Sequence, residues 1–352
     1  MNKLKIDKEV VIFTKYFGYN FTGATLATHE LIKLWSLECK KIKIITKYLG
    51  ENENIEGIEN VEIIHCKTYK QMVYELNKTY SDSSIYYSDD HLAFILKIVG
   101  KKYFHTYHAT WPEARWNNLE HFFKSFLFIP LYKIAIKNSI KEITVSNKYY
   151  QFVNKYNKNN CVIRNGLGRS GASNDKVIPN INDKKFNVVM IGNIDTRKYK
   201  LAIKLFNKIK KNKITDIKID IYGRNTNKKM VKILEKYNFV EYKGFVSKVP
   251  INNYKLMLHT ASNENLSIAI CESLKNKVPV LCYDVGGLNE VVINKDNGVL
   301  IKKGKNKEMY NKLIDIKKGN INFKFSSRII EEFEWTISSS KYISEFINEV
   351  NR

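Results

Sequence analysis

Two glutamates eight positions apart, Glu264 and Glu272, are the side chains best placed to do chemistry. Glu264 follows the apolar run 256–261 and is expected in a loop, whereas Glu272 falls inside a helix that Ser267 can cap at its amino end. A carboxylate in a loop and another in the following helix can face one ligand. Because each carboxylate oxygen accepts one O–H donor, the pair suits the neighbouring hydroxyl groups of a sugar.

A glycine pair, Gly286-Gly287, follows a predicted strand and precedes a helical-looking segment that starts at Leu288. Glycine lets backbone N–H groups approach an anion closely, and the start of a helix adds positive potential. The pair therefore indicates an anion-binding turn. An ordinary strand-to-helix turn is the alternative, and the pair alone does not exclude it.

Short β-branched runs alternate with segments of helical spacing along the chain, such as 26–37, 201–209 and 230–237. This alternation predicts an α/β protein with parallel sheets covered by helices, and it occurs twice. The expected strands are residues 10–13, 42–45, 61–64, 85–87, 103–108, 143–146, 161–164, 187–191, 217–222, 240–242, 278–283 and 299–301.

A polar segment rich in glycine and serine, residues 168–184, has no apolar periodicity and is expected to be a linker. The predicted domains are therefore residues 1–170 and 183–332, followed by a helix over 333–352. In open α/β sheets, ligands bind beyond the carboxyl ends of the strands, so function is expected in those loops.

The motifs of the second half resemble those of glycosyltransferase family 4, whose members transfer sugar from a nucleotide donor with retention of configuration. The matching residues are Glu264, Glu272, Pro279, Asp284, Gly286, Gly287, Glu290, Asn297 and Gly298. Elsewhere the resemblance rests on Thr22-Gly23-Ala24, on Val145-Ser146, on Arg164-Asn165-Gly166, on Gly192 with Arg197-Lys198, and on Gly223 with Lys243-Gly244-Phe245.

The resemblance implies the GT-B architecture, in which two Rossmann-like domains face each other across a cleft. The second domain would hold the donor and the first the acceptor, and the helix 333–352 would cross back to the first domain; a helix completing the second domain is the alternative. The implied catalytic residues are Glu264, Lys198 and His108. His108 is preferred over His105 because it lies at the carboxyl end of its strand.

The implied donor-binding residues have separate roles. Glu272 would hold the ribose, Glu264 the hydroxyls of the donor sugar, and Lys198 with Arg197 the departing diphosphate. Backbone and side-chain contacts to the donor would come from Gly23, Ser267, Gly286, Gly287 and Leu288.

No D-x-D motif occurs in the chain, and the adjacent acids Asp89-Asp90 are expected to open and cap a helix. We therefore expect no metal and no cofactor beyond the nucleotide-sugar donor. UDP is the expected nucleotide, on its frequency in the family.

Positive charge gathers in residues 91–170, which hold 13 basic and 3 acidic side chains, whereas the whole chain carries a formal charge of +24. Within this region, the segment 111–137 mixes aromatic and aliphatic residues with lysine, which is typical either of a core helix or of a membrane surface. Trp111, Arg115 and Trp116 are the predicted acceptor-side residues. The expected acceptor is a glycan, lipid-linked and part of a surface polysaccharide such as capsule or lipopolysaccharide, with peripheral contact to an anionic membrane.

The five cysteines form no C-x-x-C pair, and the first residues contain no signal-peptide core, so a cytoplasmic protein is expected. No nucleic-acid-binding module is recognisable despite the charge, which disfavours nucleic acid as a partner. The remaining alternatives are a sugar-nucleotide epimerase of the same fold and a noncatalytic protein that binds nucleotides or polyanions.

Overall fold

The computed structural model describes residues 6–52, 55–79, 84–167, 185–246 and 248–350. The linker expected at 168–184 lies outside the described residues. The chain divides into two compact units: residues 1–167 together with 333–352 form the first, and residues 168–332 form the second.

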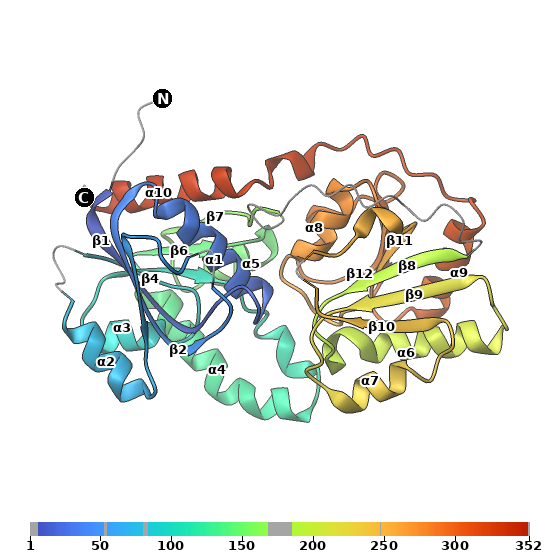
Figure 1. The fold of residues 1–352 in the computed structure, drawn as a ribbon, viewed down its shortest axis with the longest axis horizontal. Helices are drawn as coiled ribbons and strands as arrows, with labels where there is room; N and C mark the ends of the chain where they lie inside the picture. Colours follow the sequence, from blue (N-terminus) through green and yellow to red (C-terminus); the bar gives the residue numbers. More distant parts are fainter. Residues whose placement is uncertain (1–5, 53–54, 80–83, 168–184, 247, 351–352) are drawn as a thin grey trace. The chain divides into compact units, whose positions relative to one another are not determined.

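The first unit is built on a seven-stranded sheet in the order β3-β2-β1-β4-β5-β6-β7, with every neighbouring pair parallel (Figure 1). Its strands are β1 (Ile6–Phe17), β2 (Cys39–Leu49), β3 (Val61–His65), β4 (Ser84–Ser88), β5 (Tyr103–Tyr107), β6 (Lys141–Thr144) and β7 (Asn160–Val162). Its helices are α1 (Gly23–Trp35), α2 (Tyr69–Asn77), α3 (Ala93–Ile98), the short 3-10 helix η1 (Glu113–Trp116), α4 (Leu119–Asn138), α5 (Asn147–Val153) and α10 (Trp335–Val350).

The second unit has a six-stranded sheet in the order β10-β9-β8-β11-β12-β13, again entirely parallel. Its strands are β8 (Phe186–Ile191), β9 (Ile217–Tyr222), β10 (Val240–Gly244), β11 (Leu256–His259), β12 (Val280–Asp284) and β13 (Gly298–Lys302). Its helices are α6 (Thr196–Lys211), α7 (Lys228–Leu234), η2 (Ile251–Asn253), α8 (Ile268–Lys275), η3 (Leu288–Glu290), α9 (Asn306–Lys317) and η4 (Ile329–Glu332).

The predicted α/β class with two parallel sheets is confirmed, and each of the twelve expected strands overlaps an observed one. The sequence prediction missed β11, a central strand of four buried residues. Its sequence, Leu-Met-Leu-His, has no β-branched residue and is buried along its length, so neither composition nor alternation marks it as a strand.

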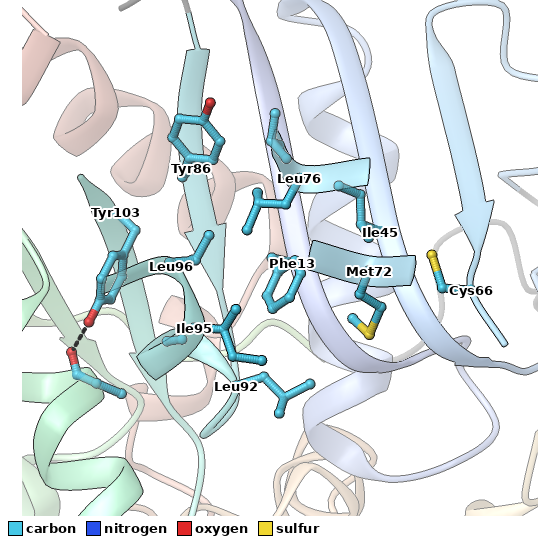
Figure 2. Packing of buried hydrophobic residues seen from close by; sticks show 13 residues of the cluster. Phe13, Ile45, Cys66, Met72, Leu76, Tyr86, Leu92, Ile95, Leu96 and Tyr103 are labelled. Atoms are coloured by element: carbon cyan, nitrogen blue, oxygen red, sulfur yellow. Dashed lines mark hydrogen bonds between the residues drawn. The ribbon is translucent and has the colours of Figure 1, made fainter. Parts of the chain in front are cut away.

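Apolar residues from β1, β2, α2 and α3 form the core on one face of the first sheet. Figure 2 shows Phe13 at the centre of this cluster, between Met72 of α2 and Ile95 of α3. The Tyr103 hydroxyl, also in the cluster, donates a hydrogen bond to the carbonyl of Ala135 at 2.8 Å. The buried tyrosine is thereby satisfied, and it ties α4 to the sheet.

The last helix, α10, belongs to the first unit and packs beside α1 (Figure 1). Its Tyr342 and Phe346 rings make edge contacts with the buried Trp35 of α1, with centroids 5.5 and 5.1 Å apart. Close to the start of the helix, Gly166 leaves no room for a side chain, because a Cβ there would lie 2.4 Å from Trp335.

Candidate functional site

Each sheet has one topological switch point, where the chain stops adding strands in one direction and continues on the other side. In the second unit this point lies between β8 and β11, and in the first unit between β1 and β4. Loops at the carboxyl ends of these strands form the ligand crevice of a doubly wound sheet. Most of the residues predicted from sequence lie in or near these loops.

In the second unit, the loop after β8 brings Gly192 and Lys198 together. Gly192 has a φ of +142°, and a Cβ on it would lie 2.2 Å from the Lys198 Nζ, so the lysine side chain extends across the glycine. Asp195 caps α6 and accepts the Lys198 N–H at 2.8 Å. The Thr260 hydroxyl, just after β11, donates to the Lys198 carbonyl at 2.7 Å. The backbone of Lys198 is thus held from both sides of the switch point.

Glu264 lies beside Arg197 and His259. Its Oε2 accepts from Arg197 Nη1 at 3.2 Å and lies 3.5 Å from His259 Nε2. Arg197 also donates to the carbonyl of Asn263 at 2.8 Å. Burial by itself raises the pKa of Glu264, but Arg197, His259 and Lys198 outweigh it and hold this pKa well below its usual range. Glu264 is therefore a carboxylate at neutral pH.

His259 is a site residue that sequence reasoning missed. It ends β11 and is almost completely buried, and burial lowers its pKa despite the neighbouring carboxylate. Burial also lowers the pKa of Lys198, against the attraction of Glu264. The signal that could have found His259 is its place at the carboxyl end of a strand five residues before Glu264, but β11 itself was not recognised.

The Gly286-Gly287 turn packs directly against the Glu264 loop. Gly286 has a φ of +59°, and a Cβ on it would lie 1.6 Å from the carbonyl oxygen of Glu264. The Gly287 N–H donates to the carbonyl of Asn265 at 2.8 Å. The buried Leu288 then begins η3. Glycine at 286 is required both by its conformation and by the close approach of the two loops.

The other two predicted donor-side residues of the second unit lie at α8. Ser267 is the N-cap of this helix and accepts the N–H of Ile270, and Glu272 is half-buried within the helix. The structure therefore brings Arg197, Lys198, Glu264 and the glycine turn together, whereas Glu272 lies one helix turn beyond the cap.

In the first unit, Gly23 is the first residue of α1 and is exposed. Thr22 caps the helix and forms a reciprocal pair of hydrogen bonds with Thr25, at 3.0 and 3.2 Å. The amino end of α1 is thus fixed next to the switch point of the sheet, where backbone N–H groups can meet an anion.

The two histidines of β5 and its following loop differ in their contacts. The ring of His105 is fully buried, with Nδ1 2.8 Å from Glu142 Oε1 and Nε2 3.1 Å from the carbonyl of Asp90. The Nε2 of His108 is buried and has no hydrogen-bond partner among the described residues. Burial lowers the pKa of His108 to about 3, so its ring is neutral near pH 7. His105 is committed to an internal ion pair, and His108 is the one with a nitrogen available to a ligand.

Asp89 and Asp90 accept hydrogen bonds near the end of β4 and do not cap α3 as predicted. The Asp90 carboxylate accepts the N–H of Leu92 at 2.7 Å, in the turn that precedes α3. Asp89 is instead buried at the carboxyl end of β4, where it accepts hydrogen bonds from the hydroxyls of Thr14 and Thr28 at 2.6 and 2.5 Å. The prediction that these acids cap a helix is therefore wrong for both, because the N-cap of α3 is Leu92 and no side chain caps it. Asp89 instead joins β1, β4 and α1 at the switch point.

The predicted acceptor-side residues lie around η1. Trp111 stacks on Phe128 of α4 at a centroid distance of 5.9 Å, and the Arg115 guanidinium lies 4.7 Å from the ring of Trp116. Trp116 is exposed. Trp111 is thus committed to packing on α4, and Trp116 presents its ring to solvent.

Among the residues that the structure describes, no group of three or more His, Cys, Asp and Glu side chains could hold a metal ion. Within those same ranges, no helix combines the length and the apolar character needed to cross a membrane.

Residues 172–332 match the model of the family described as "Glycosyl transferases group 1". The matched segment is somewhat less than half of the chain and includes the whole Arg197–Lys198–Glu264 cluster. This match confirms the glycosyltransferase class predicted from the motifs. No curated protein matches the chain in sequence.

Solved structures with low sequence identity share the fold over nearly the whole chain. HepE from Anabaena, determined in complex with UDP and glucose, is 15% identical with a TM-score of 0.74, covering 97% of this chain and 100% of HepE. A glycosyltransferase from Rickettsia africae is 14% identical with a TM-score of 0.68, covering 98% of this chain and 99% of its own. WaaG, a glycosyltransferase involved in lipopolysaccharide biosynthesis, is 13% identical with a TM-score of 0.69, covering 95% of each chain. The fold is GT-B.

Proposed function

We propose that the protein is a retaining glycosyltransferase of family 4 that moves a hexose from a UDP-sugar to a glycan acceptor. The observation that carries the proposal is the cluster of Arg197, Lys198 and Glu264 at the switch point of the second sheet, inside the segment that matches the glycosyltransferase group 1 family. HepE, which shares the fold, was solved with UDP and glucose, which supports a UDP-sugar as donor.

The two cations of the cluster suit the charge that develops when the bond between sugar and diphosphate breaks. The diphosphate oxygen then gains negative charge, which Lys198 and Arg197 would stabilise without rearrangement. Their positions are fixed in advance by the Asp195 cap and by the Asn263 carbonyl. No metal ion is needed for this role, so we propose a metal-independent transfer.

Glu264 would hold the donor sugar. Both of its ion pairs use Oε2, so Oε1 is the oxygen that would accept a sugar hydroxyl. Its low pKa keeps it an acceptor over the whole physiological range. Glu272 would hold the ribose, and the N–H groups at Gly286 to Leu288 would meet phosphate or sugar.

The acceptor would bind to the first unit, where His108 offers a buried, neutral nitrogen. We propose that the acceptor is a lipid-linked glycan of a surface polysaccharide, reached from the cytoplasmic face of the membrane. The basic region 91–170 supports attraction to such an anionic surface.

A transfer assay tests this proposal. The protein is incubated in EDTA with UDP-glucose, UDP-galactose or UDP-N-acetylglucosamine and a bacterial lipid-linked glycan extract, and the product linkage is determined by NMR. We expect one donor to give a product with the α configuration of that donor. A β-linked product would refute retention, an epimerised sugar nucleotide without transfer would establish an epimerase, and activity that returns only on adding Mn²⁺ would refute metal independence.

A further inference from the structure

Helix α4 exposes several large apolar side chains on the side that does not pack against its own unit. It packs against α3, β5 and η1 of its own unit, and its fully buried residues are Ser125, Ala135 and Ile136. On the other side, four large apolar side chains are exposed: Leu119 at 72%, Phe123 at 63%, Phe126 at 66% and Leu127 at 60%. Core packing was one of the two interpretations of this segment, and it is wrong for these four residues.

The spacing of these residues places them on one stripe. Relative to Leu119 they lie at i+4, i+7 and i+8, which is one face of an α-helix. Ile134, also exposed, continues the stripe at i+15, and the exposed Trp116 of η1 precedes it. A helix that is apolar on all sides needs a cover on each side, and an exposed patch of this size marks an interaction surface.

The charges around the stripe indicate what covers it. Lys133 and Lys137 follow on the same face, seven and eleven residues after Phe126, and both are exposed. Lys124 flanks the stripe, and Lys97 of α3, the helix on which α4 packs, is exposed as well. The nearby acids are Glu113 and Glu120, and Glu120 is paired with Lys124. Apolar and aromatic side chains bordered by lysine match the boundary between lipid headgroups and acyl chains.

We propose that the exposed face of α4, together with Trp116, is a membrane-docking surface that inserts its rings into the interface of an anionic bilayer. The face would lie parallel to the membrane, with the aromatic rings among the acyl chains and the lysines at the phosphates. This surface would bring the enzyme to the lipid-linked acceptor proposed above. The inference rests on the surface itself and does not depend on the identity of the donor.

Vesicle flotation tests the proposal with the full chain. The probes are vesicles of phosphatidylcholine alone and of phosphatidylcholine mixed with phosphatidylglycerol, at low and moderate salt. We expect the wild-type protein to float with the anionic vesicles, and Phe123→Glu combined with Phe126→Glu to lower the bound fraction roughly tenfold or more. The matched control is Leu37→Glu with Tyr74→Glu, which makes the same charge change at two exposed apolar residues outside α4 and should float like the wild type.

A second pair of variants tests the charges. Lys133→Gln with Lys137→Gln should weaken flotation and reduce its salt dependence, whereas Lys210→Gln with Lys211→Gln, two exposed lysines of α6, should not. The UDP-induced thermal shift of each variant reports whether it is folded and is independent of docking. The proposal is overturned if the wild type does not float with anionic vesicles. It is also overturned if the Phe123/Phe126 variant floats to the same extent as the wild type. A wild-type dimer that the same variant converts to monomer, without vesicle binding, would show that a second copy covers the face.

Discussion

Lys198 shows how much local structure is needed to hold one charged side chain in this site. Its side chain extends over Gly192, its N–H is bonded to the cap of its own helix, and its carbonyl is bonded to a residue beyond β11. Burial lowers its pKa, and the nearby Glu264 carboxylate opposes this change. A departing diphosphate would restore negative charge beside it at the moment the bond breaks, which is when a catalyst needs the attraction.

Asp89 predicts a pH dependence of stability. Burial, and then the adjacent Asp90 carboxylate, raise the pKa of Asp89 to about 6, whereas about 3.9 is expected in an unfolded chain. Because the folded pKa is the higher one, the stabilisation is fully present below about pH 4 and is lost as the pH rises through about 6. The free energy of unfolding of the wild type relative to Asp89→Asn should therefore fall by about 2 to 3 kcal/mol between about pH 4 and 7.

Urea unfolding of both proteins across this pH range measures the difference directly. Comparing the two proteins at each pH removes the contributions of the titrating groups that do not interact with Asp89. A difference that is constant with pH, or that grows as the pH rises, would show that Asp89 does not titrate as described.

At the scale of elements, the close packing of two loops decides the geometry of the candidate site. Gly286→Ala would place a Cβ against the Glu264 carbonyl in a backbone conformation that alanine disfavours. We expect it to destabilise the protein by more than about 2 kcal/mol, because the clash adds to the conformational cost. Nucleotide binding should weaken as well, since the Glu264 loop must shift.

Gly304→Ala is the matched control for this change. Gly304 also has a positive φ, of +85°, but nothing lies within 4 Å of a Cβ built there. Gly304→Ala should lower the free energy of unfolding only by the conformational cost of a positive φ, about 1 to 2 kcal/mol, and should leave nucleotide binding unchanged. Equal thermal stability and equal UDP affinity of the two variants would refute the role assigned to the loop contact.

Much of the element pattern could be predicted from the sequence, because parallel strands buried on both faces carry β-branched runs that stand out between amphipathic helices. The strand β11 was not predicted because it is short and has no β-branched residue. Its leucines and methionine fit a helix equally well. His259 was missed with it. Asp89 was misassigned because an acid after a strand can either cap the next helix or turn inward, and only the threonines of β1 and α1, distant in sequence, decide between the two.

For α4 the sequence left two interpretations open, a core helix and a membrane surface, and could not decide between them. Its apolar residues have the same composition as a core helix, and burial depends on which side meets the rest of the unit. One side of the helix packs on α3, and the apolar residues at helical spacing on the other side are exposed. A spacing that normally indicates burial therefore marks an exposed face in this helix.

At the scale of the whole molecule, the two sheets repeat one plan, and each places charged or glycine-rich loops at its switch point. In the second unit these loops hold cations with a carboxylate, a combination that suits the nucleotide-sugar donor proposed above. In the first unit they hold the α1 amino end, the Asp89 network and the neutral His108. The division of labour between donor and acceptor is thus proposed from the chemistry of each unit taken by itself.

The thermal shift of the purified protein with UDP in EDTA tests the central claim most directly, with GDP, ADP and CMP as comparisons. A nucleotide at 100 times its dissociation constant adds about 2.7 kcal/mol to the free energy of unfolding, which raises the melting temperature by several degrees. We predict this shift for UDP with the wild type and with Lys200→Met, an exposed lysine of α6, and its loss with Lys198→Met. No shift with UDP, or an equal shift in Lys198→Met, would contradict the assignment of this cluster as the donor site.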